Sequence, residues 1–333
     1  MKKATAIIAA LGLLLSLAAC APAEHTRSFF AMDTYMELRA QAPEEVLART
    51  EELIRSMESQ LSVTLPGSDI YSLNETGSAR VSARTLALCR RALEICGETD
   101  GALDITVYPA LRAWGFTTGS YRVPGPEELA ALSPLVDYKS VALEGGTVTL
   151  PRGAMLDLGA VAKGAAGDAA AELLRQSGVK SGLVNLGGSV TCIGSKSDGS
   201  DWRVAVRDPV GRGYAAVLSV SDVSVVTSGG YERFFEEGGI TYWHILDPKT
   251  LAPARSGLIS VTVVGPDATR CDGLSTALFV MGAEKAAEFW RRSGDFEMLL
   301  ITREGKIIIT RALAERAEYR SGYGEELEVL SRD

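Results

Sequence analysis

Residues 157–188 read DLGAVAKGAAGDAAAELLRQSGVKSGLVNLGG, and this stretch decides the fold that the sequence predicts. The apolar run that opens it, residues 155–158, ends at a glycine and predicts the end of a strand. Alanine and leucine then recur every three or four residues up to Leu174, which predicts a helix with one apolar face that stops at Gly178. Residues 182–185 predict a strand that ends at a Gly-Gly pair, so the order is that of a βαβ-like unit.

The glycine turn before this helix is a candidate anion site. A helix N-terminus exposes unpaired N–H groups that favour anions. Asp157 and Lys163 lie beside this turn, and Lys163 could serve as a point charge for phosphate. The turn matches neither the dinucleotide motif G-x-G-x-x-G nor the phosphate loop G-x-x-x-x-G-K-[ST]. Close packing of a helix on a strand is the more common reason for such glycines, so both interpretations stay open.

Composition predicts an ordinary globular protein. The chain has 333 residues, of which 46% are hydrophobic and 23% are charged, which is ample for a core. The net charge of −8 argues against nucleic acid as a partner, because phosphate binding needs a basic surface. Strands dominate and helices are interspersed irregularly, so we expect the α+β class, with mixed sheets in a single compact body.

The N-terminus has the features of a bacterial lipoprotein signal. Two lysines precede an apolar stretch that is too short for a comfortable membrane span. Residues 17–20 read LAAC and resemble a lipobox, so we expect residues 1–19 to be a signal peptide and Cys20 to carry a lipid. An ordinary secretory signal with a chance cysteine is the alternative. Residues 20–28 are then a tether, and residues 29–333 are a folded domain held outside the cytoplasm at a bacterial membrane.

The remaining elements follow from periodicity and turn residues. Pro43 is expected to start a helix that reaches Leu61, and Ser82 is expected to cap a helix that stops at Gly97. Further expected elements are strands at residues 29–38, 202–207, 215–220, 223–226, 241–246 and 259–264, hairpins at 141–150 and 298–310, and helices that begin near Asp272 and span 284–292.

The four cysteines after Cys20 are expected to be small core residues. Cys89 and Cys96 fall on one predicted helix, about 10 Å apart along its axis, which is too far for a disulfide. Cys192 and Cys271 have no cysteine neighbour at metal-ligand spacing, so zinc and iron are not expected. A disulfide is the less favoured alternative.

Two features could carry chemistry outside the central stretch. His244 is the histidine that remains when His25 is assigned to the tether, and its pKa suits proton transfer, although a structural role is equally compatible. Asp272 and Thr276 are spaced i, i+4, which places a carboxylate and a hydroxyl on one helix face. Such oxygens, completed by water and phosphate, suit Mg²⁺, and helix capping is the alternative.

Seven separated motifs together resemble the ApbE family, the FAD:protein FMN transferases, over residues 32–282. Each motif is weak alone, but their common order makes chance negligible. The motifs are Met32-Asp33-Thr34, DGALDITVYPALRAWGF from Asp100, LDLGAVAKG from Leu156, LVNLGGSV from Leu183, TSGGYERFF from Thr227, HILDP from His244 and DGLSTALFVMG from Asp272.

The resemblance implies a T-fold-related body and a Mg²⁺-dependent reaction. FAD is split at its pyrophosphate, FMN passes to a Ser or Thr hydroxyl of an acceptor flavoprotein in a membrane electron-transport system, and AMP leaves. By similarity, the metal ligands are Asp272, Thr276 and the Ala160 carbonyl, with Ser275 nearby, and His244 assists as acid or base beside the catalytic Asp272. The matching FAD contacts are Met32, Ala102, Leu103, Asp104, Asp157, Lys163 and Leu246.

Three positions depart from the family pattern. Residues 61–65 lack the tyrosine that family members often carry there, Tyr108 stands where Gly is frequent, and Gly230 stands where Asp is common. Altered nucleotide affinity is therefore expected. Two other functions stay open, namely a non-catalytic flavin-binding lipoprotein and an enzyme that hydrolyses FAD to FMN and AMP.

Overall fold

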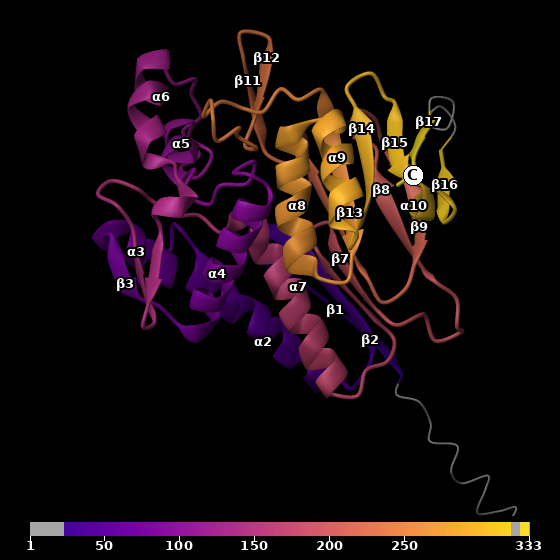
Figure 1. The fold of residues 1–333 in the computed structure, drawn as a ribbon. Coiled ribbons are helices and arrows are strands. Elements are labelled where there is room, and N and C mark those ends of the chain that lie inside the picture. The colour runs from indigo at the N-terminus through magenta and orange to yellow at the C-terminus, as the bar shows by residue number, and fades with distance from the viewer. Residues whose placement is uncertain (1–22, 321–326, 333) are drawn as a thin grey trace, which may run out of the picture.

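The structure, a computed structural model, describes residues 23–320 and 327–332. These residues form one body in which a large sheet carries helices on one face and a smaller sheet on part of the other (Figure 1). The α+β class expected from the sequence is confirmed. Among the described helices, none combines the length and the hydropathy needed to cross a bilayer. The expected signal peptide, Cys20 and the start of the tether lie outside the described residues.

The large sheet has nine strands, in the spatial order β1 (Glu24–Ala31), β2 (Thr34–Gln41), β6 (Gly182–Leu186), β7 (Ser189–Ile193), β10 (Ser224–Gly229), β13 (Leu258–Gly265), β14 (Glu297–Thr302), β15 (Ile307–Thr310) and β17 (Leu327–Leu330). Neighbouring strands are antiparallel, except that β15 and β17 are parallel. The central strands β7, β10 and β13 are buried along most of their length, because both faces of the sheet are covered there.

Helices cover one face of this sheet (Figure 1). The largest are α2 (Glu44–Leu61), α4 (Ala83–Glu98), α7 (Gly159–Gln176), α8 (Ala268–Met281) and α9 (Ala283–Ser293). Helix α8 is buried on nearly every side, since it packs against α4, α7, α9 and the strands β10 and β13. Its polar residues therefore lie inside the protein.

A second sheet covers part of the opposite face. It consists of β8 (Trp202–Arg207), β9 (Tyr214–Val220) and β16 (Ala317–Tyr319). Its apolar side chains form a second core with residues of the large sheet such as Val190, Ile301 and Ile309. Among the described residues, none of the buried members of this second core comes from β1 or β2, so the outer face of that hairpin is left uncovered by the second sheet.

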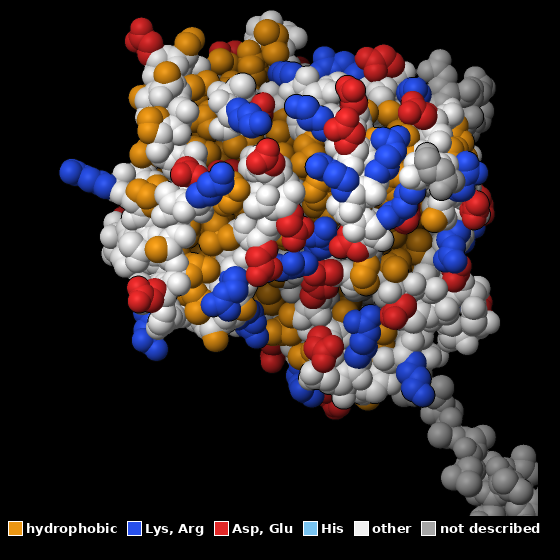
Figure 2. Space-filling model, in the orientation of Figure 1, with side chains coloured by type: hydrophobic (Ala, Val, Ile, Leu, Met, Phe, Trp, Pro, Cys, Tyr) orange, Lys and Arg blue, Asp and Glu red, His pale blue; other side chains and the backbone are white. Residues whose placement is uncertain are grey.

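The smaller elements gather beside α4 and α8. They are α3 (Asp69–Thr76), α5 (Tyr108–Ala113), α6 (Pro126–Leu132), the sheet of β3 (Ser78–Arg80), β5 (Thr147–Thr149) and β4 (Ala142–Glu144), the hairpin of β11 (Phe234–Glu237) and β12 (Ile240–Trp243), and the 3₁₀ turns Ser133–Leu135 and Tyr138–Ser140. Helix α10 (Arg311–Ala314) instead packs against β14, β15 and β17. An aromatic cluster that includes Trp114, Phe235 and Tyr242 joins the β11–β12 hairpin to α5. The face shown in Figure 2 carries Lys and Arg interspersed with Asp and Glu.

Two glycines allow α7 to pack closely against its neighbours, Gly164 against α8 and Gly167 against β7. A Cβ on Gly164 would lie 2.2 Å from the Ala268 carbonyl oxygen and 2.8 Å from the Asp272 Cβ. A Cβ on Gly167 would lie 2.9 Å from the Thr191 hydroxyl. The alanine-rich stretch therefore serves helix–helix packing, and it brings the backbone of α7 within reach of Asp272.

The expected βαβ-like order is wrong at the start of α7, whereas the strand expected after the helix at residues 182–185 is confirmed as β6. Residues 155–158 form no strand, and Met155 makes only an isolated bridge to Val107. After the helix, β6 turns directly into β7 at Gly187 and Gly188, and the two strands are antiparallel. A connection this short permits only an antiparallel pair, whereas a parallel pair needs a crossover of a dozen or more residues.

The expected N-terminal boundary is also wrong. The single strand predicted at residues 29–38 is two strands, joined by a turn at Met32 and Asp33, whose φ angles are 47° and 59°. Strand β1 begins at Glu24, inside the expected tether of residues 20–28. The polar residues before Phe29 escaped recognition because every second side chain of β1 faces solvent, so their hydropathy resembles that of a linker.

Most other elements are confirmed within a few residues. Helix α2 follows Pro43, and the Ser82 hydroxyl accepts from the Thr85 amide at the start of α4. The hairpins β4–β5 and β14–β15 and the strands β8, β9, β10 and β13 fall where expected. The four described cysteines are free and buried. Helix α3 and the strands β11 and β17 were not anticipated.

Candidate active site

Several strand ends meet at one end of the large sheet. The register Met36↔Leu186 places the turn between β1 and β2 beside the turn between β6 and β7. Strand β10 is antiparallel to β7, so it finishes at the same end, and the chain continues there through residues 230–233. An ion pair of 3.2 Å between Asp33 and Arg233 joins the first turn to this segment.

The junction of α7 and α8 holds a buried carboxylate at this end. Asp272 is 3% exposed, and its Oδ2 accepts from the Gly164 amide at 2.8 Å. In a regular helix the Gly164 amide would bond to the Ala160 carbonyl, so this contact draws the donor away from that carbonyl. Burial raises the pKa of Asp272, and the positive charge of Lys163 and the Gly164 amide oppose the rise.

Three hydroxyls lie next to Asp272. The Ser275 hydroxyl donates to the Asp272 carbonyl at 2.8 Å and lies 2.7 Å from the Ser228 hydroxyl. The Ser228 hydroxyl also lies 3.3 Å from the Thr276 hydroxyl. Ser275 is fully buried, whereas Ser228 and Thr276 are half-buried, so the latter two are the more accessible oxygens of this row.

Charged side chains surround the junction. Desolvation raises the pKa of the Glu232 carboxyl, the positive charge of Lys163 opposes the rise and the negative charge of Asp272 adds to it, so these three groups interact electrostatically. Asp157 accepts from the Gly159 amide at 2.8 Å. Burial raises the pKa of Asp157, and Arg233 and Lys163 oppose this rise. Glu232 is exposed and Asp157 is half-buried, so this side of the junction is open to solvent, and we call it the recess.

His244 lies at the same recess. Its Nδ1 is 3.2 Å from the Arg233 carbonyl. A carbonyl oxygen only accepts, so in the neutral ring Nδ1 carries the proton and Nε2 keeps a lone pair. Desolvation, assisted by the charges of Arg233 and Lys163, lowers the pKa of His244 to about 4. The imidazole is therefore neutral, and able to accept a proton, at physiological pH.

Met32 and Leu246 are predicted flavin contacts that border the recess. Met32 occupies the turn that Asp33 ties to Arg233, and its amide donates to Glu58 Oε1 at 2.6 Å. Leu246 follows His244 by two residues and is buried in the aromatic cluster. Met32 is therefore tied to the recess through the Asp33–Arg233 pair, and Leu246 is tied to it through its own segment, which carries His244.

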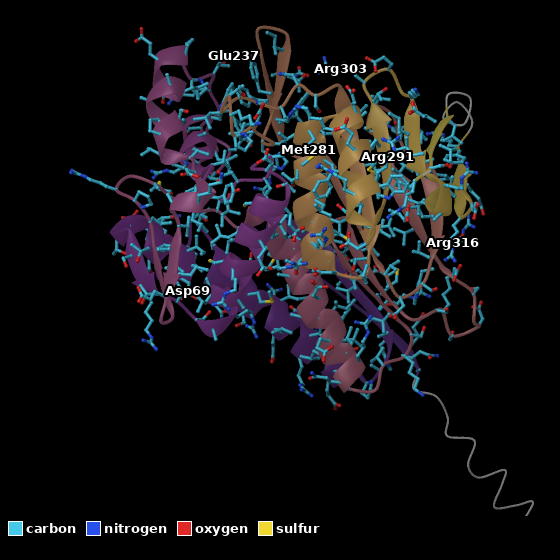
Figure 3. All side chains as sticks on the ribbon, viewed as in Figure 1. Asp69, Glu237, Met281, Arg291, Arg303 and Arg316 are labelled. Carbon is cyan, nitrogen blue, oxygen red and sulfur yellow. The ribbon has the colours of Figure 1, made fainter. Side chains whose placement is uncertain are left out.

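The loop 102–104 packs against α8 next to Asp272. Leu103 is buried and approaches Gly273 of α8. Asp104 is buried, and its oxygens accept from Thr106 (backbone 2.8 Å, hydroxyl 2.6 Å) and from the Tyr138 amide (3.0 Å). The Asp104 carboxylate thus organises its own loop. Ala102 lines a groove of about 320 Å³ beside the upper end of α8, where Figure 3 labels Met281.

Two departures from the family pattern have a structural explanation. Tyr108 is buried, and its hydroxyl donates to the Val63 carbonyl at 3.3 Å, so it braces the loop that lacks the family's tyrosine. A Cβ on Gly230 would lie 3.0 Å from the Trp243 ring, so an aspartate there would require that ring to move.

The site contains residues that the sequence did not single out. Ser228, Glu232 and Arg233 belong to the motif TSGGYERFF, which was recognised as a block without separate roles. Asp168 was also missed; it accepts from the Ala268 and Thr269 amides, each at 2.8 Å, and so holds the start of α8 against α7. The sequence signal that could have identified these four residues is that each is a polar residue inside a recognised motif or inside an otherwise apolar helix.

The donor set fits a hard divalent cation. Among the described residues, no group of three or more His, Cys, Asp or Glu is placed to hold a metal. Asp272 offers one buried carboxylate, Thr276 follows it by one helical turn with its hydroxyl 3.3 Å from that of Ser228, and the Ala160 carbonyl is the oxygen that the Gly164 amide would otherwise bond. Mg²⁺ is commonly bound by one or two carboxylates together with substrate phosphates and water, so these residues suit it better than zinc.

Fold and site define an α+β protein that gathers a buried carboxylate, a lysine and a histidine at one end of its large sheet. The model of the ApbE family matches residues 32–300. A FAD:protein FMN transferase of Treponema pallidum is 35% identical over 320 residues, which cover 88% of each chain. That of Haemophilus influenzae is 30% identical and covers 94% of this chain and 96% of its own.

Solved structures give the same picture. The ApbE protein of Thermotoga maritima superimposes with a TM-score of 0.85 at 31% identity, covering 88% of this chain and 99% of that one. The flavin transferase ApbE of Vibrio cholerae has a TM-score of 0.78 at 26% identity, covering 88% and 100%. The chain belongs to the ApbE family, as the sequence motifs predicted.

Proposed function

We propose that the chain transfers FMN from FAD to a Ser or Thr hydroxyl of an acceptor flavoprotein, with AMP as the leaving group and Mg²⁺ as the cofactor. Family membership and the relatives' shared name support a flavin transferase. The observation that carries the mechanism is the α7–α8 junction, where the Gly164 amide holds Asp272 beside Lys163.

The residues of the junction would bind the cation and the diphosphate. Asp272, Thr276 and the Ala160 carbonyl would hold Mg²⁺. Ser275 would support them through its hydrogen bonds with the Asp272 carbonyl and the Ser228 hydroxyl. Bound Mg²⁺ would neutralise charge on the bridging phosphates. Lys163 would add a point charge from α7, in a recess where its field is weakly screened.

His244 would act on the acceptor. Its Nε2 lone pair would take the proton of the acceptor hydroxyl as the new O–P bond to FMN forms and the P–O bond to AMP breaks. The Arg233 carbonyl holds the ring in the required tautomer. Met32, Ala102, Leu103, Asp104, Asp157 and Leu246 are the remaining residues proposed to shape the FAD site.

The location is part of the proposal. We propose that residues 1–19 are removed and that Cys20 anchors the enzyme to the membrane outside the cytoplasm, near acceptors of an electron-transport system. The charged start, the short apolar stretch and the LAAC sequence support this. A Cys20→Ser variant should lose incorporation of labelled palmitate and leave the membrane fraction; full membrane retention without label would contradict a lipid anchor.

The activity is tested by mass spectrometry of candidate membrane flavoproteins after incubation with the full chain, FAD and Mg²⁺. An acceptor that gains the mass of an FMN group, only when all components are present, supports the transferase. AMP release at the same rate without an acceptor would indicate an FAD hydrolase instead. Retention of intact FAD with no AMP would indicate a binding protein.

A further inference from the structure

The first turn of α8 is capped by carboxylates from two different helices. The first amides of a helix have no acceptor within the helix, so they need partners from elsewhere. The N-cap residue of α8, Asp267, accepts from the Arg270 amide at 2.8 Å. The amides of Ala268 and Thr269 donate instead to Asp168, a half-buried residue of α7. Part of the cap of α8 is therefore supplied by its neighbour.

The Asp168 carboxylate uses both of its oxygens in this cap. Its Oδ1 accepts from the Ala268 amide at 2.8 Å, and its Oδ2 accepts from the Thr269 amide at 2.8 Å and the Thr269 hydroxyl at 2.6 Å. Hydrogen bonds to an ionised carboxylate are stronger than neutral ones, and a helix N-terminus favours a negative charge. These contacts are directional, whereas the apolar packing around the rest of α8 is not.

A second contact between the same helices runs in the opposite sense. The Gly164 amide of α7 donates to Asp272 of α8 at 2.8 Å. Gly164 precedes Asp168 by four residues and Asp272 follows Ala268 by four, so the two contacts are about one turn apart and the helices are antiparallel there. A shift of α8 along α7 would break both contacts, so together they fix the register of the two helices.

We infer that Asp168 is a positioning residue for the cation site. The inference rests on the proposed function, in which Asp272 and Thr276 of α8 and the Ala160 carbonyl of α7 hold Mg²⁺. Since these oxygens come from both helices, the distances between them depend on the register that Asp168 sets. Asp168 follows Ala160 by eight residues, about 12 Å along the helix axis, so it acts on the site through α8 and is not itself a ligand.

The test measures how tightly the full chain binds Mn²⁺, which replaces Mg²⁺ because free Mn²⁺ can be followed by electron paramagnetic resonance. FAD is present and the acceptor is left out. The variant is Asp168→Asn, which keeps the size of the side chain but replaces one acceptor oxygen by an NH₂ donor. The matched control is Asp267→Ala, which removes a cap from the same turn of α8, together with an ion pair to Arg91 at 2.8 Å, but leaves the contacts with α7 in place.

Asp168→Asn should weaken Mn²⁺ binding by about tenfold, which is the usual effect of residues that orient metal ligands without touching the metal. Asp267→Ala should stay within about twofold of the wild type, even if its melting temperature falls as much. A second measurement needs no metal. Hydrogen exchange at the Gly164 amide should be faster in Asp168→Asn than in Asp267→Ala, because only the first substitution releases the register that pairs this amide with Asp272.

Three results would overturn the inference. They are Mn²⁺ binding by Asp168→Asn within about twofold of the wild type, an equal loss in Asp267→Ala, and equal exchange at Gly164 in the two variants. If Asp168→Asn does not fold, Thr269→Val removes the hydroxyl bond alone and should weaken Mn²⁺ binding by about threefold; no loss would overturn the inference as well. A wild-type chain that binds no Mn²⁺ would instead count against the proposed function, and the inference would fall with it.

Discussion

At the α7–α8 junction, Asp272 is almost fully buried and a backbone amide fixes one of its oxygens; at the turn between β1 and β2, Asp33 has a side chain that is 81% exposed and pairs with Arg233 at the surface. The junction allows no room for change, because Gly164 lies against Ala268 and Asp272. The exposed turn can change without disturbing the core. A substitution at the junction is therefore expected to affect activity more than a substitution at the turn.

The largest effect is expected at the junction. Asp272→Ala should lower the transfer rate at least about a hundredfold, because it removes the one carboxylate proposed to hold the cation. The measurement is the rate of FMN transfer as a function of Mg²⁺ concentration. Asp222→Ala is the control, since Asp222 also accepts from a backbone amide, Gly194 at 3.1 Å, but is exposed. A near-normal rate for Asp272→Ala at limiting Mg²⁺ would reject the assignment.

His244→Ala should slow transfer by about a hundredfold while FAD binding is retained, because a positioned base contributes roughly 10²–10⁴ in rate. His25→Ala is the control, since its Nδ1 also meets a carbonyl, that of Ala42, at 2.8 Å. An equal loss of FAD binding in His244→Ala would make His244 a positioning residue.

The pH profile sharpens the assignment. The pKa of His244 is lowered to about 4, so the ring loses its lone pair to a proton only as the pH falls through about 4. The wild-type rate should therefore be nearly equal at about pH 5.5 and pH 7.5. An acidic limb with its midpoint near the ordinary value of about 6.5 would show that the imidazole is solvated and that the recess is open.

Gly164→Ala should destabilise the fold by about 1–3 kcal/mol, because its Cβ would overlap the Ala268 carbonyl. Gly97→Ala is the control: it lies within α4 with no atom within 4 Å of the added Cβ, so it should be neutral or slightly stabilising. Thermal unfolding measures both. An unchanged melting temperature for Gly164→Ala would mean that α7 and α8 are not in tight contact.

The smallest effect is expected for the Asp33–Arg233 pair. Asp33→Asn should change the transfer rate by less than about threefold, because exposed ion pairs contribute little. Glu318→Gln, in the exposed pair with Arg203, is the control. A loss as large as that of His244→Ala would place Asp33 in the reacting site and remove the distinction between the exposed turn and the junction.

The parts of the fold that could be predicted are those specified by neighbouring residues. The caps at Ser82 and Pro43, the alanine face of α7 and the short hairpins depend on side chains a few positions apart. The boundary of β1 could not be predicted, because hydropathy alternates only weakly from Glu24 to Ser28. These residues are recognised as a strand only when their pairing with β2 is known.

The sequence by itself determined the family, the residue types of the site and most of the helices, because these are recorded in local patterns and in the order of the motifs. Only the tertiary structure decided that the Gly164 amide meets Asp272, 108 positions away, and that Ser228, Glu232 and Arg233 join His244 and Lys163 at one end of the sheet. The physical reason is that such contacts depend on how helices and strands pack. Packing depends on the sum of many weak interactions between distant segments, and no single stretch of the chain specifies it.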